Sequence, residues 1–414
     1  MKNKYDFIVI GGGAAGIMAA IQAARDGKEV LLLEKLPKIG AKLKATGGGR
    51  CNLTNRVPKG EFMEAFGRDG RFMRDALEAF DSSDLVKFFA GIGVDTNSLD
   101  GFRVFPTSRS SATVVEALQG ELLRVGVDIK CNQKVEEILQ KDGEIRGVKT
   151  ANGSFFAKNI ALCSGGAGYP SLGSEGDGYE MAKELGHTIK PLYPAMLPLK
   201  TKESWVAKCT ADTLPKVQIK VDMKKHKKLK ATGDLIFTKN GIRGPVVLDF
   251  AREITPLIER YGEVGVVLNV LKDMDEDKIY NYLREYSFKE AQISTLDIVS
   301  TLLPKSLANE LILSVGTDPD KRYKDIKGEQ RQKLIKTLHC IPLTIVGDDG
   351  FDKAMITRGG VSLKEIDPKT MQSRLVGGLY FCGEVVDIDG PCGGYNLQWS
   401  FSSGYLCAKS IKIS

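Results

Sequence analysis

Short apolar runs on either side of an alanine-rich stretch predict a strand, a helix and a second strand at the start of the chain. Residues 6–10 (DFIVI) form an apolar, β-branched run that is typical of a buried parallel strand. Residues 17–25 are alanine-rich and read as a helix, which Gly27 ends. Residues 29–33 (EVLLL) read as a second strand, closed by Glu34. Together these segments predict a βαβ unit.

The following residues alternate between helical and extended patterns. Apolar residues at helical spacing predict helices over 71–90 and 111–125. Three short apolar runs separated by turns predict a small antiparallel meander of strands at 127–129, 134–139 and 145–150. Residues 159–164 predict a further strand that runs into Gly165 and Gly166.

A change of composition near residue 191, in the proline-rich PLYPAMLPL, marks a second region. Up to about residue 274 the pattern predicts strands, in VQIKVDM, LIFT, VVLDFA and EVGVVLNVL. Residues 275–338 read as mostly helical, with Lys/Glu-rich amphipathic stretches. Strands return in PLTIVG, KAMITRGGV and residues 379–381, and a helix from about Asn396 closes the chain.

This order predicts an α/β fold in which a nucleotide-binding domain is interrupted and later resumed. We expect the nucleotide-binding domain to comprise residues 1–192 and 357–414. A β-rich insert is expected at 193–274 and 339–356, and a helical insert at 275–338.

Composition narrows the class of protein. A chain of 414 residues with 42% hydrophobic and 27% charged residues is typical of a globular protein with two or three domains. The net charge of +7 comes from interspersed Lys and Glu, which favours a lysine-rich surface over an anionic partner. Eight cysteines without a CxxC argue against a zinc site, and no metal is expected. No run approaches the roughly 18 apolar residues of a membrane span, so we expect a cytoplasmic protein with no membrane partner.

The first glycine loop predicts a dinucleotide site. Gly11, Gly13 and Gly16 form GxGxxG, with Ala14 and Ala15 inside it, between the strand and the helix. Gly11 permits a tight turn, Gly13 lets the backbone reach a pyrophosphate, and Gly16 lets the helix pack on the strand. A carboxylate at Glu34 suits ribose hydroxyls and repels a 2′-phosphate, which favours FAD or NAD over NADP.

The segment after Glu34 favours FAD. Residues 35–55 (KLPKIGAKLKATGGGRCNLTN) are rich in lysine and glycine and are expected to form a loop. A loop that comes back to the pyrophosphate after the second strand suits a large, extended cofactor. Arg50 can neutralise phosphate charge and Asn52 can bond the edge of a flavin. Cys51 is interpreted as a small buried residue rather than a nucleophile.

Five segments in this order carry a resemblance to a known family: GGGAAG…LLLEK…GGGRCNLTN, CSGGAGYPSLGSEGDGYEMAKELGHTI, LIFTKNGIRGPVVL, GGVSLKEIDPKTMQS and GLYFCGEVVDIDGPCGGYNLQWSFSSG. Over nearly its whole length the sequence closely resembles the bacterial flavoproteins that include aminoacetone oxidases and BaiN-type reductases of dehydro-bile acids. The resemblance implies a glutathione-reductase-like Rossmann FAD domain with an inserted β-barrel domain, which itself carries a small helical domain. Lys239 and Arg243 depart from the pattern of the family in a loop that the resemblance places toward the substrate.

The resemblance also implies that the second glycine loop holds the same cofactor. Gly383 and Glu384 would pass under the flavin, and the helix starting at Asn396 and Leu397 would direct its positive end at the reduced ring. The predicted residues for non-covalent FAD binding are Gly11, Gly13, Ala14, Ala15, Gly16, Glu34, Lys35, Gly49, Arg50, Cys51, Asn52, Val135, Gly165, Gly383, Glu384, Asp389, Gly393, Gly394, Asn396 and Leu397.

The expected chemistry is hydride transfer at flavin N5 to or from a small organic molecule. Tyr169, Tyr395 and Arg103 are the candidates for a proton donor, and no other catalytic residue is assigned. His187 is interpreted as structural and His226 as part of a solvated hairpin turn.

Several activities fit this site. Lys239 and Arg243 suit an acidic substrate or a nicotinamide phosphate, which favours NAD(P)H-dependent reduction of a conjugated C=C, such as that of an enone in a dehydro-bile acid. Since a second GxGxxG is absent, NAD(P)H would be a transient donor. The alternative is an O2-dependent oxidase of a small amine such as aminoacetone.

Two further alternatives are a flavin-dependent RNA-modifying protein and a non-enzymatic flavin-binding protein. The one basic run in the sequence, at 223–230 (MKKHKKLK), lacks interleaved aromatic residues for base stacking and reads as a hairpin tip. We therefore expect a small-molecule substrate and no nucleic-acid partner, and the oligomeric state is left open.

Overall fold

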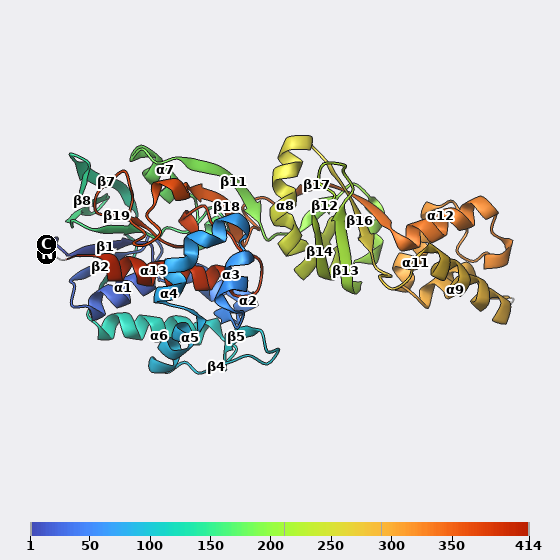
Figure 1. Ribbon diagram of the computed structural model, residues 1–414, viewed down its shortest axis with the longest axis horizontal. Coiled ribbons are helices and arrows are strands. Elements are labelled where there is room, and N and C mark those ends of the chain that lie inside the picture. Colours follow the sequence, from blue (N-terminus) through green and yellow to red (C-terminus); the bar gives the residue numbers. More distant parts are fainter. Residues whose placement is uncertain (1, 211, 291, 413–414) are drawn as a thin grey trace. The chain divides into compact units, whose positions relative to one another are not determined.

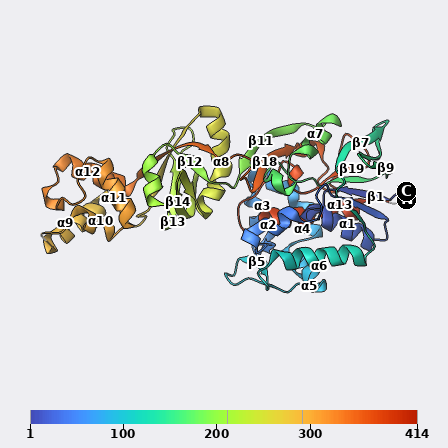
Figure 2. The same ribbon diagram turned by 180° about the vertical axis from the view of Figure 1, so that it is seen from behind.

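A computed structural model describes residues 2–210, 212–290 and 292–412 (Figure 1; Figure 2). The chain divides into two compact units, of which the first comprises Met1–Pro194 and Ala354–Ser414 and the second Ala195–Lys353. The two ends of the chain, blue to green and red in Figure 1, thus build one unit, and the intervening residues build the other.

A parallel sheet forms the centre of the first unit, with the strand order β19-β10-β1-β2-β6. Its strands are β1 (Phe7–Ile10), β2 (Val30–Leu33), β6 (Asp128–Lys130), β10 (Ile160–Leu162) and β19 (Leu379–Phe381). The side chains of β1, β2, β10 and β19 are all buried, as expected for a parallel sheet that is covered on both faces. Because β19 pairs with β10, the end of the chain completes the sheet that its beginning starts.

Helices pack around this sheet. α1 (Ala14–Arg25) contacts both α13 (Tyr395–Ser410) and α6 (Ser111–Arg124), and α1 and α13 lie side by side in both ribbon views. The other helices of this unit are α2 (Ala41–Gly49), α3 (Lys59–Glu64), α4 (Arg74–Ala79), α5 (Ser82–Gly91) and α7 (Asp177–Glu184). Smaller sheets contain β3 (Thr54–Asn55), β4 (Thr96–Asn97) and β5 (Arg103–Pro106), and β11 (Ile189–Ala195) with β18 (Ile356–Val361).

The predicted meander needs one correction. Residues 127–129 do not join it, because β6 pairs in parallel with β2 at the edge of the central sheet. The meander instead consists of β7 (Val135–Lys141), β8 (Glu144–Thr150) and β9 (Gly153–Phe156). A run of three apolar residues does not indicate which strand it will pair with. The chain returns from α6 to the edge of the central sheet and so places β6 beside β2.

The expected loop over 35–55 is wrong in part. Residues 41–45 form the first turns of α2, and the backbone leaves the helical region at Thr46, Gly47 and Gly48. Both glycines have a positive φ, of 59° and 65°. The helix that begins at residue 41 is therefore interrupted where Gly47 and Gly48 adopt a left-handed backbone conformation.

A closed antiparallel barrel forms the second unit, with the strand order β12-β15-β14-β13-β16-β17. Its strands are β12 (Leu199–Thr201), β13 (Thr213–Val221), β14 (Lys230–Thr238), β15 (Gly241–Arg243), β16 (Val264–Asn269) and β17 (Ile341–Asp348). In β16 buried and half-buried residues alternate, which is the pattern of a strand with one face in a core.

The prediction of a strand in VVLDFA is wrong. These residues belong to α8 (Pro245–Tyr261), a helix that begins with proline in its first turn. The buried positions recur at helical spacing over the whole helix: Val246, Val247, Phe250, Ala251, Ile254 and Leu257. A window of six residues is too short to separate a buried strand from a buried helix.

The helical prediction for residues 275–338 is confirmed, and the helices are gold to orange in Figure 1. They are α9 (Glu276–Lys289), α10 (Thr295–Ser300), α11 (Lys305–Ser314) and α12 (Gly328–His339). Among the residues that the structure describes, no helix combines the length and the apolar character needed to cross a bilayer.

Candidate functional site

A cavity of about 1020 Å³, counting the space open to solvent at its mouth, lies in the first unit. Its walls include the residues that directly follow β1, β10 and β19, so it lies at the carboxyl ends of neighbouring parallel strands. This edge is where open α/β sheets bind nucleotides.

The first glycine loop forms one wall of the cavity. Gly11 has φ +105°, and a Cβ there would lie 2.5 Å from the carbonyl oxygen of Cys163. A Cβ at Gly16 would collide with the carbonyl oxygen of Gly11. At Gly13, by contrast, a Cβ would meet no atom of the described residues within 4 Å, so the backbone faces open space. Gly11 and Gly16 therefore shape the turn, while Gly13 leaves room for a ligand.

α1 presents its N-terminus to this space. No side chain of the described residues caps the helix, and its first turn carries no acidic residue. The N–H groups and the positive end of the helix therefore suit an anion such as a pyrophosphate. The open backbone at Gly13 and this N-terminus fit the pyrophosphate of FAD.

Glu34 is fixed beside the glycine loop. Its Oε2 accepts a hydrogen bond from the Gly12 N–H and its Oε1 from the Leu36 N–H, each at 2.8 Å. The carboxylate lines the cavity and also an adjoining small pocket, which includes Lys35 and Val135. Lys35 lies 3.0 and 2.9 Å from carboxylate oxygens of Glu175 and Asp177.

The second glycine loop contacts the end of the 35–55 segment. In the amide orientation that satisfies both groups, the Asn52 oxygen accepts from the Gly394 N–H at 3.0 Å. The Asn55 amide donates to the Gly393 carbonyl at 3.0 Å. Asn396 bonds both backbone groups of Gly390 at 2.8 Å and lines the cavity. The amides of Asn52 and Asn55 hold the second glycine loop against the 35–55 segment. Residues of both glycine loops line the same cavity.

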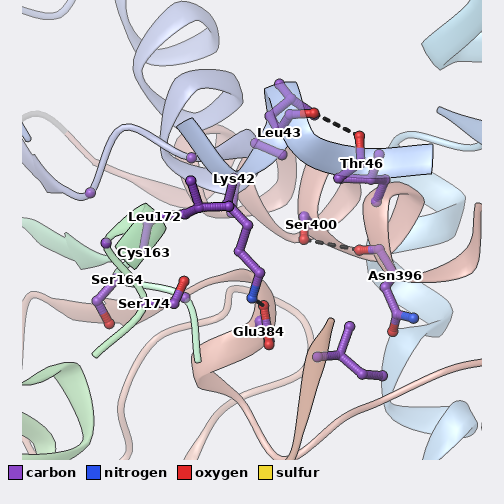
Figure 3. Close-up of a pocket in the computed structure, with 18 of the residues that line it drawn as sticks. Lys42, Leu43, Thr46, Cys163, Ser164, Leu172, Ser174, Glu384, Asn396 and Ser400 are labelled. Carbon is purple, nitrogen blue, oxygen red and sulfur yellow. Dashed lines mark hydrogen bonds and ion pairs between the residues drawn. The ribbon is translucent and has the colours of Figure 1, made fainter. Parts of the chain in front are cut away.

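An ion pair crosses the cavity wall between Lys42 and Glu384, as Figure 3 shows. The Lys42 Nζ lies 2.8 Å from Glu384 Oε2, and Glu384 Oε1 accepts from the Thr357 N–H at 2.8 Å. Lys42 is the one lysine or arginine among the described residues of the lining. The sequence pattern does not single it out, since 35–55 holds four lysines and no spacing distinguishes this one.

Two thiols also line the cavity, Cys163 after β10 and Cys382 after β19. Contact with Cys382 and burial raise the pKa of Cys163, and burial raises the pKa of Cys382. Burial likewise raises the pKa of Cys51 to about 11. All three are therefore protonated near neutral pH, which disfavours a role as a nucleophile. The interpretation of Cys51 as a small buried residue is confirmed.

The predicted cofactor residues divide into three groups, of which the smallest, Lys35 and Val135, lines the small adjoining pocket. Ten line the cavity: Gly11, Gly13, Ala14, Ala15, Glu34, Gly165, Glu384, Asp389, Asn396 and Leu397. Eight line neither pocket: Gly16, Gly49, Arg50, Cys51, Asn52, Gly383, Gly393 and Gly394. Of these, Arg50 is exposed, bonds the Gly47 carbonyl at 3.1 Å and lies over the ring of Phe105.

The three candidate proton donors lie outside the lining of the cavity. Arg103 is exposed and pairs with Asp100 at 2.7 Å. Tyr395 is buried, with its ring centroid 4.8 Å from that of Phe62. Tyr169 has φ +57° at the start of a short 3-10 turn. None of them is brought to the cavity, and their catalytic role stays a prediction.

His187 is buried and bonded to the Ala182 carbonyl at 3.2 Å and to Ser373 Oγ at 2.8 Å. Burial lowers the pKa of His187, so the ring is neutral. The structural interpretation of this residue is confirmed.

Comparison with known proteins identifies the relatives of the chain. The HI0933-like protein Rossmann domain matches residues 5–410. The 3-dehydro-bile acid delta(4,6)-reductase of Clostridium scindens is 35% identical over 408 residues, which cover 97% of this chain and 98% of that protein. The ribosomal RNA dihydrouridine synthase of Haemophilus influenzae is 31% identical over 417 residues, 99% of each chain.

A solved structure shares the fold. The 3-ketosteroid delta1-dehydrogenase from Sterolibacterium denitrificans superimposes with a TM-score of 0.53 at 15% identity, over 99% of each chain. The resemblance inferred from the sequence is thus confirmed. With its Rossmann-type FAD domain and inserted barrel, the chain belongs to the HI0933-like family, and it is an FAD-dependent oxidoreductase.

Proposed function

We propose that this protein reduces a C=C bond conjugated to a carbonyl group, with NAD(P)H as a transient electron donor. The relative of 35% identity is named for the reduction of such a bond in a 3-dehydro steroid acid. The double bond that is lost when uridine becomes dihydrouridine is also conjugated to a carbonyl, and a second relative is named for that product. One chemistry therefore covers both names.

The described residues support this proposal by the way they would hold FAD. The backbone at Gly13 and the N-terminus of α1 would bind the pyrophosphate, and Glu34 would accept from ribose hydroxyls. The Lys42–Glu384 pair would bond the middle of the cofactor. The N-terminus of α13, which begins at Tyr395 behind Gly394, would stabilise negative charge at the ring.

When bound, FAD reduced by NAD(P)H would supply hydride chemistry at N5 for the carbon β to the carbonyl, and the α carbon would take a proton. The sequence contains no second GxGxxG, so we expect NAD(P)H to bind only transiently. Such a use of free NAD(P)H fits the cytoplasmic location expected from the sequence.

Anaerobic mixing tests the proposal. The purified protein should show flavin absorbance that NADH or NADPH bleaches and that a 3-oxo-4,6-diene steroid acid restores, with the reduced steroid as product. If neither nicotinamide bleaches the flavin, the reductase is wrong. If aminoacetone bleaches it and only O2 restores it, with peroxide formed, the oxidase alternative holds. Stable flavin without turnover would favour a non-enzymatic flavin protein.

Uracil in RNA is the second candidate substrate. It is favoured by a relative of 31% identity that matches 99% of both chains, so the whole architecture is shared. The test is incubation of ribosomal RNA from cells that lack the gene with the protein and NADPH. Uracil reduction adds the mass of two hydrogen atoms to a nucleoside, and mass spectrometry of the digested RNA detects it.

A further inference from the structure

We infer that the β13–β14 hairpin and the C-terminal end of α8 form a surface that binds single-stranded RNA. We call it the basic hairpin surface, and its residues are Lys224, Lys225, His226, Lys227, Lys228, Lys230, Arg260 and Tyr261. The choice of RNA over DNA rests on the proposed function, in which uracil in RNA is the second candidate substrate. It departs from the expectation that the protein has no nucleic-acid partner.

The lysines of this surface lack ionic partners. β13 and β14 are paired antiparallel, so the basic run forms the exposed turn of a hairpin, as its sequence predicts. All five lysines are exposed, and none forms an ion pair with a carboxylate of the described residues. Other lysines of the same unit do pair, as Lys202 does with Glu263 at 3.1 Å. A cluster of uncompensated charge on a short turn favours a polyanion.

Aromatic rings lie within this cluster although the basic run contains none besides His226. His226 Nε2 lies 3.2 Å from the Tyr261 hydroxyl, and the two ring centroids are 5.7 Å apart. The Arg260 guanidinium lies 5.2 Å from the centre of the Tyr261 ring. Both rings are half-buried, so each keeps an accessible part. Lysines around such rings suit RNA, whose phosphates pair with cations and whose bases stack on rings and guanidinium groups.

The acidic residues nearby do not cancel the charge. Asp222 opens the turn and Glu259 precedes Arg260, and both are exposed. Glu263, two residues after Tyr261, is also exposed but already pairs with Lys202, so three carboxylates stand against the six cations of this surface. A membrane surface fits less well, because membrane-binding segments place large apolar side chains beside their lysines. Among the described residues, the exposed large apolar side chains lie elsewhere in the chain than residues 222–230.

Fluorescence anisotropy of the full-length protein with a labelled oligouridine of about 20 nucleotides tests the inference. The test variant replaces Lys224, Lys225, Lys227 and Lys228 with alanine. The control variant replaces Lys321, Lys324 and Lys327, three exposed lysines of the same unit. We expect wild type and control to bind alike at about 50 mM salt and the test variant to bind at least tenfold more weakly. The salt slope should fall by up to about 3, since each phosphate contact contributes about 0.7.

The ring is tested separately. Tyr261→Ala should weaken binding at least about fivefold through lost stacking, and Tyr261→Phe should restore most of the loss. All variants should keep the flavin absorbance of the wild type and its rate of bleaching by NAD(P)H, which shows that the fold and the FAD site are intact.

The outcomes are distinct. Absence of wild-type binding at low salt, or equal binding by the test variant, overturns the inference. Tighter binding to vesicles of anionic lipid than to RNA, with the same lysine dependence, assigns the surface to a membrane instead. If the lysine-dependent RNA binding holds but neither uracil nor the steroid is reduced, the surface stands and the proposed function fails.

Discussion

The Lys42 ammonium lies 2.8 Å from the Glu384 carboxylate although 342 residues separate them in the chain. The pair joins α2 to the loop after β19 and closes the wall of the cavity. Each side chain is about one-fifth exposed, at 22% and 18%. It therefore keeps contact with the space in which we propose that FAD binds, and it leads to the first prediction.

Lys42→Met should weaken FAD binding at least roughly tenfold, because it removes the cation of the lining and leaves Glu384 without its partner. Titration of FAD into the FAD-free protein, followed by quenching of flavin fluorescence, measures the dissociation constant. Lys87→Met is the matched control, since Lys87 is 74% exposed and pairs with Asp84 only at 3.6 Å. Equal dissociation constants for the two variants would refute a role of Lys42 in the site.

Alanine substitutions in the first glycine loop should affect protein stability at one position and FAD affinity at another. Gly16→Ala should lower the melting temperature of the FAD-free protein, because the new Cβ collides with the Gly11 carbonyl. Gly13→Ala should leave that temperature nearly unchanged, since its Cβ meets no described atom within 4 Å. It should still raise the FAD dissociation constant, because the methyl group occupies the space meant for the pyrophosphate. Unchanged FAD affinity in Gly13→Ala would place the cofactor elsewhere.

Asp387 should make stability decrease as pH rises from about 4 to about 6. Burial, aided by the carboxylates of Asp69 and Asp389 and opposed by Lys190 and Arg358, raises its pKa to about 6. Between the unfolded pKa of about 3.9 and this value the folded state binds more protons, so raising the pH favours unfolding. Asp387→Asn should remove this loss and stabilise the protein at pH 7 by roughly 1 kcal/mol, as measured by urea unfolding at several pH values.

Asp100→Asn is the control of opposite sign. The hydrogen bond from Arg103 and two backbone N–H groups lower the pKa of Asp100 to about 2. Its contribution to stability is present above the unfolded pKa and is lost as the pH falls toward 2. Asp100→Asn should therefore reduce the dependence of the unfolding free energy on pH only between about pH 4 and pH 2. If Asp387→Asn and Asp100→Asn changed this pH dependence in the same way, the pKa shifts given for the two residues would be wrong.

Trp399→Phe should lower the free energy of unfolding by about 1–3 kcal/mol. The indole is 1% exposed and donates to the Gly383 carbonyl at 3.1 Å, and phenylalanine leaves that carbonyl with only the longer bond from the Val386 N–H at 3.3 Å. Tyr405→Phe on the same helix is the control, because its ring can keep the stacking on Phe80 at 4.5 Å. Thermal unfolding measured by circular dichroism compares the two, and equal melting temperatures would show that the Gly383 bond is not needed.

Short sequence windows were sufficient to predict a helix or strand where the window itself contains the apolar spacing or the glycines typical of that element. The βαβ unit follows from apolar runs and glycine spacing, and β1, α1 and β2 lie where these predict. Six residues of VVLDFA did not suffice, since only the whole of α8 shows the helical recurrence of buried positions. The three residues of β6 likewise gained their place from β2 and not from their own pattern.

By itself the sequence determined the class of the fold, the interrupted first domain and the two glycine loops, because backbone conformation and apolar periodicity are local properties. Only the tertiary structure decided which distant side chains meet. It paired Lys42 with Glu384, joined Asn52 to Gly394 and placed Tyr261 against His226. These contacts depend on how whole helices and strands pack against one another. The local sequence around a lysine or a tyrosine does not specify which distant residue it will contact.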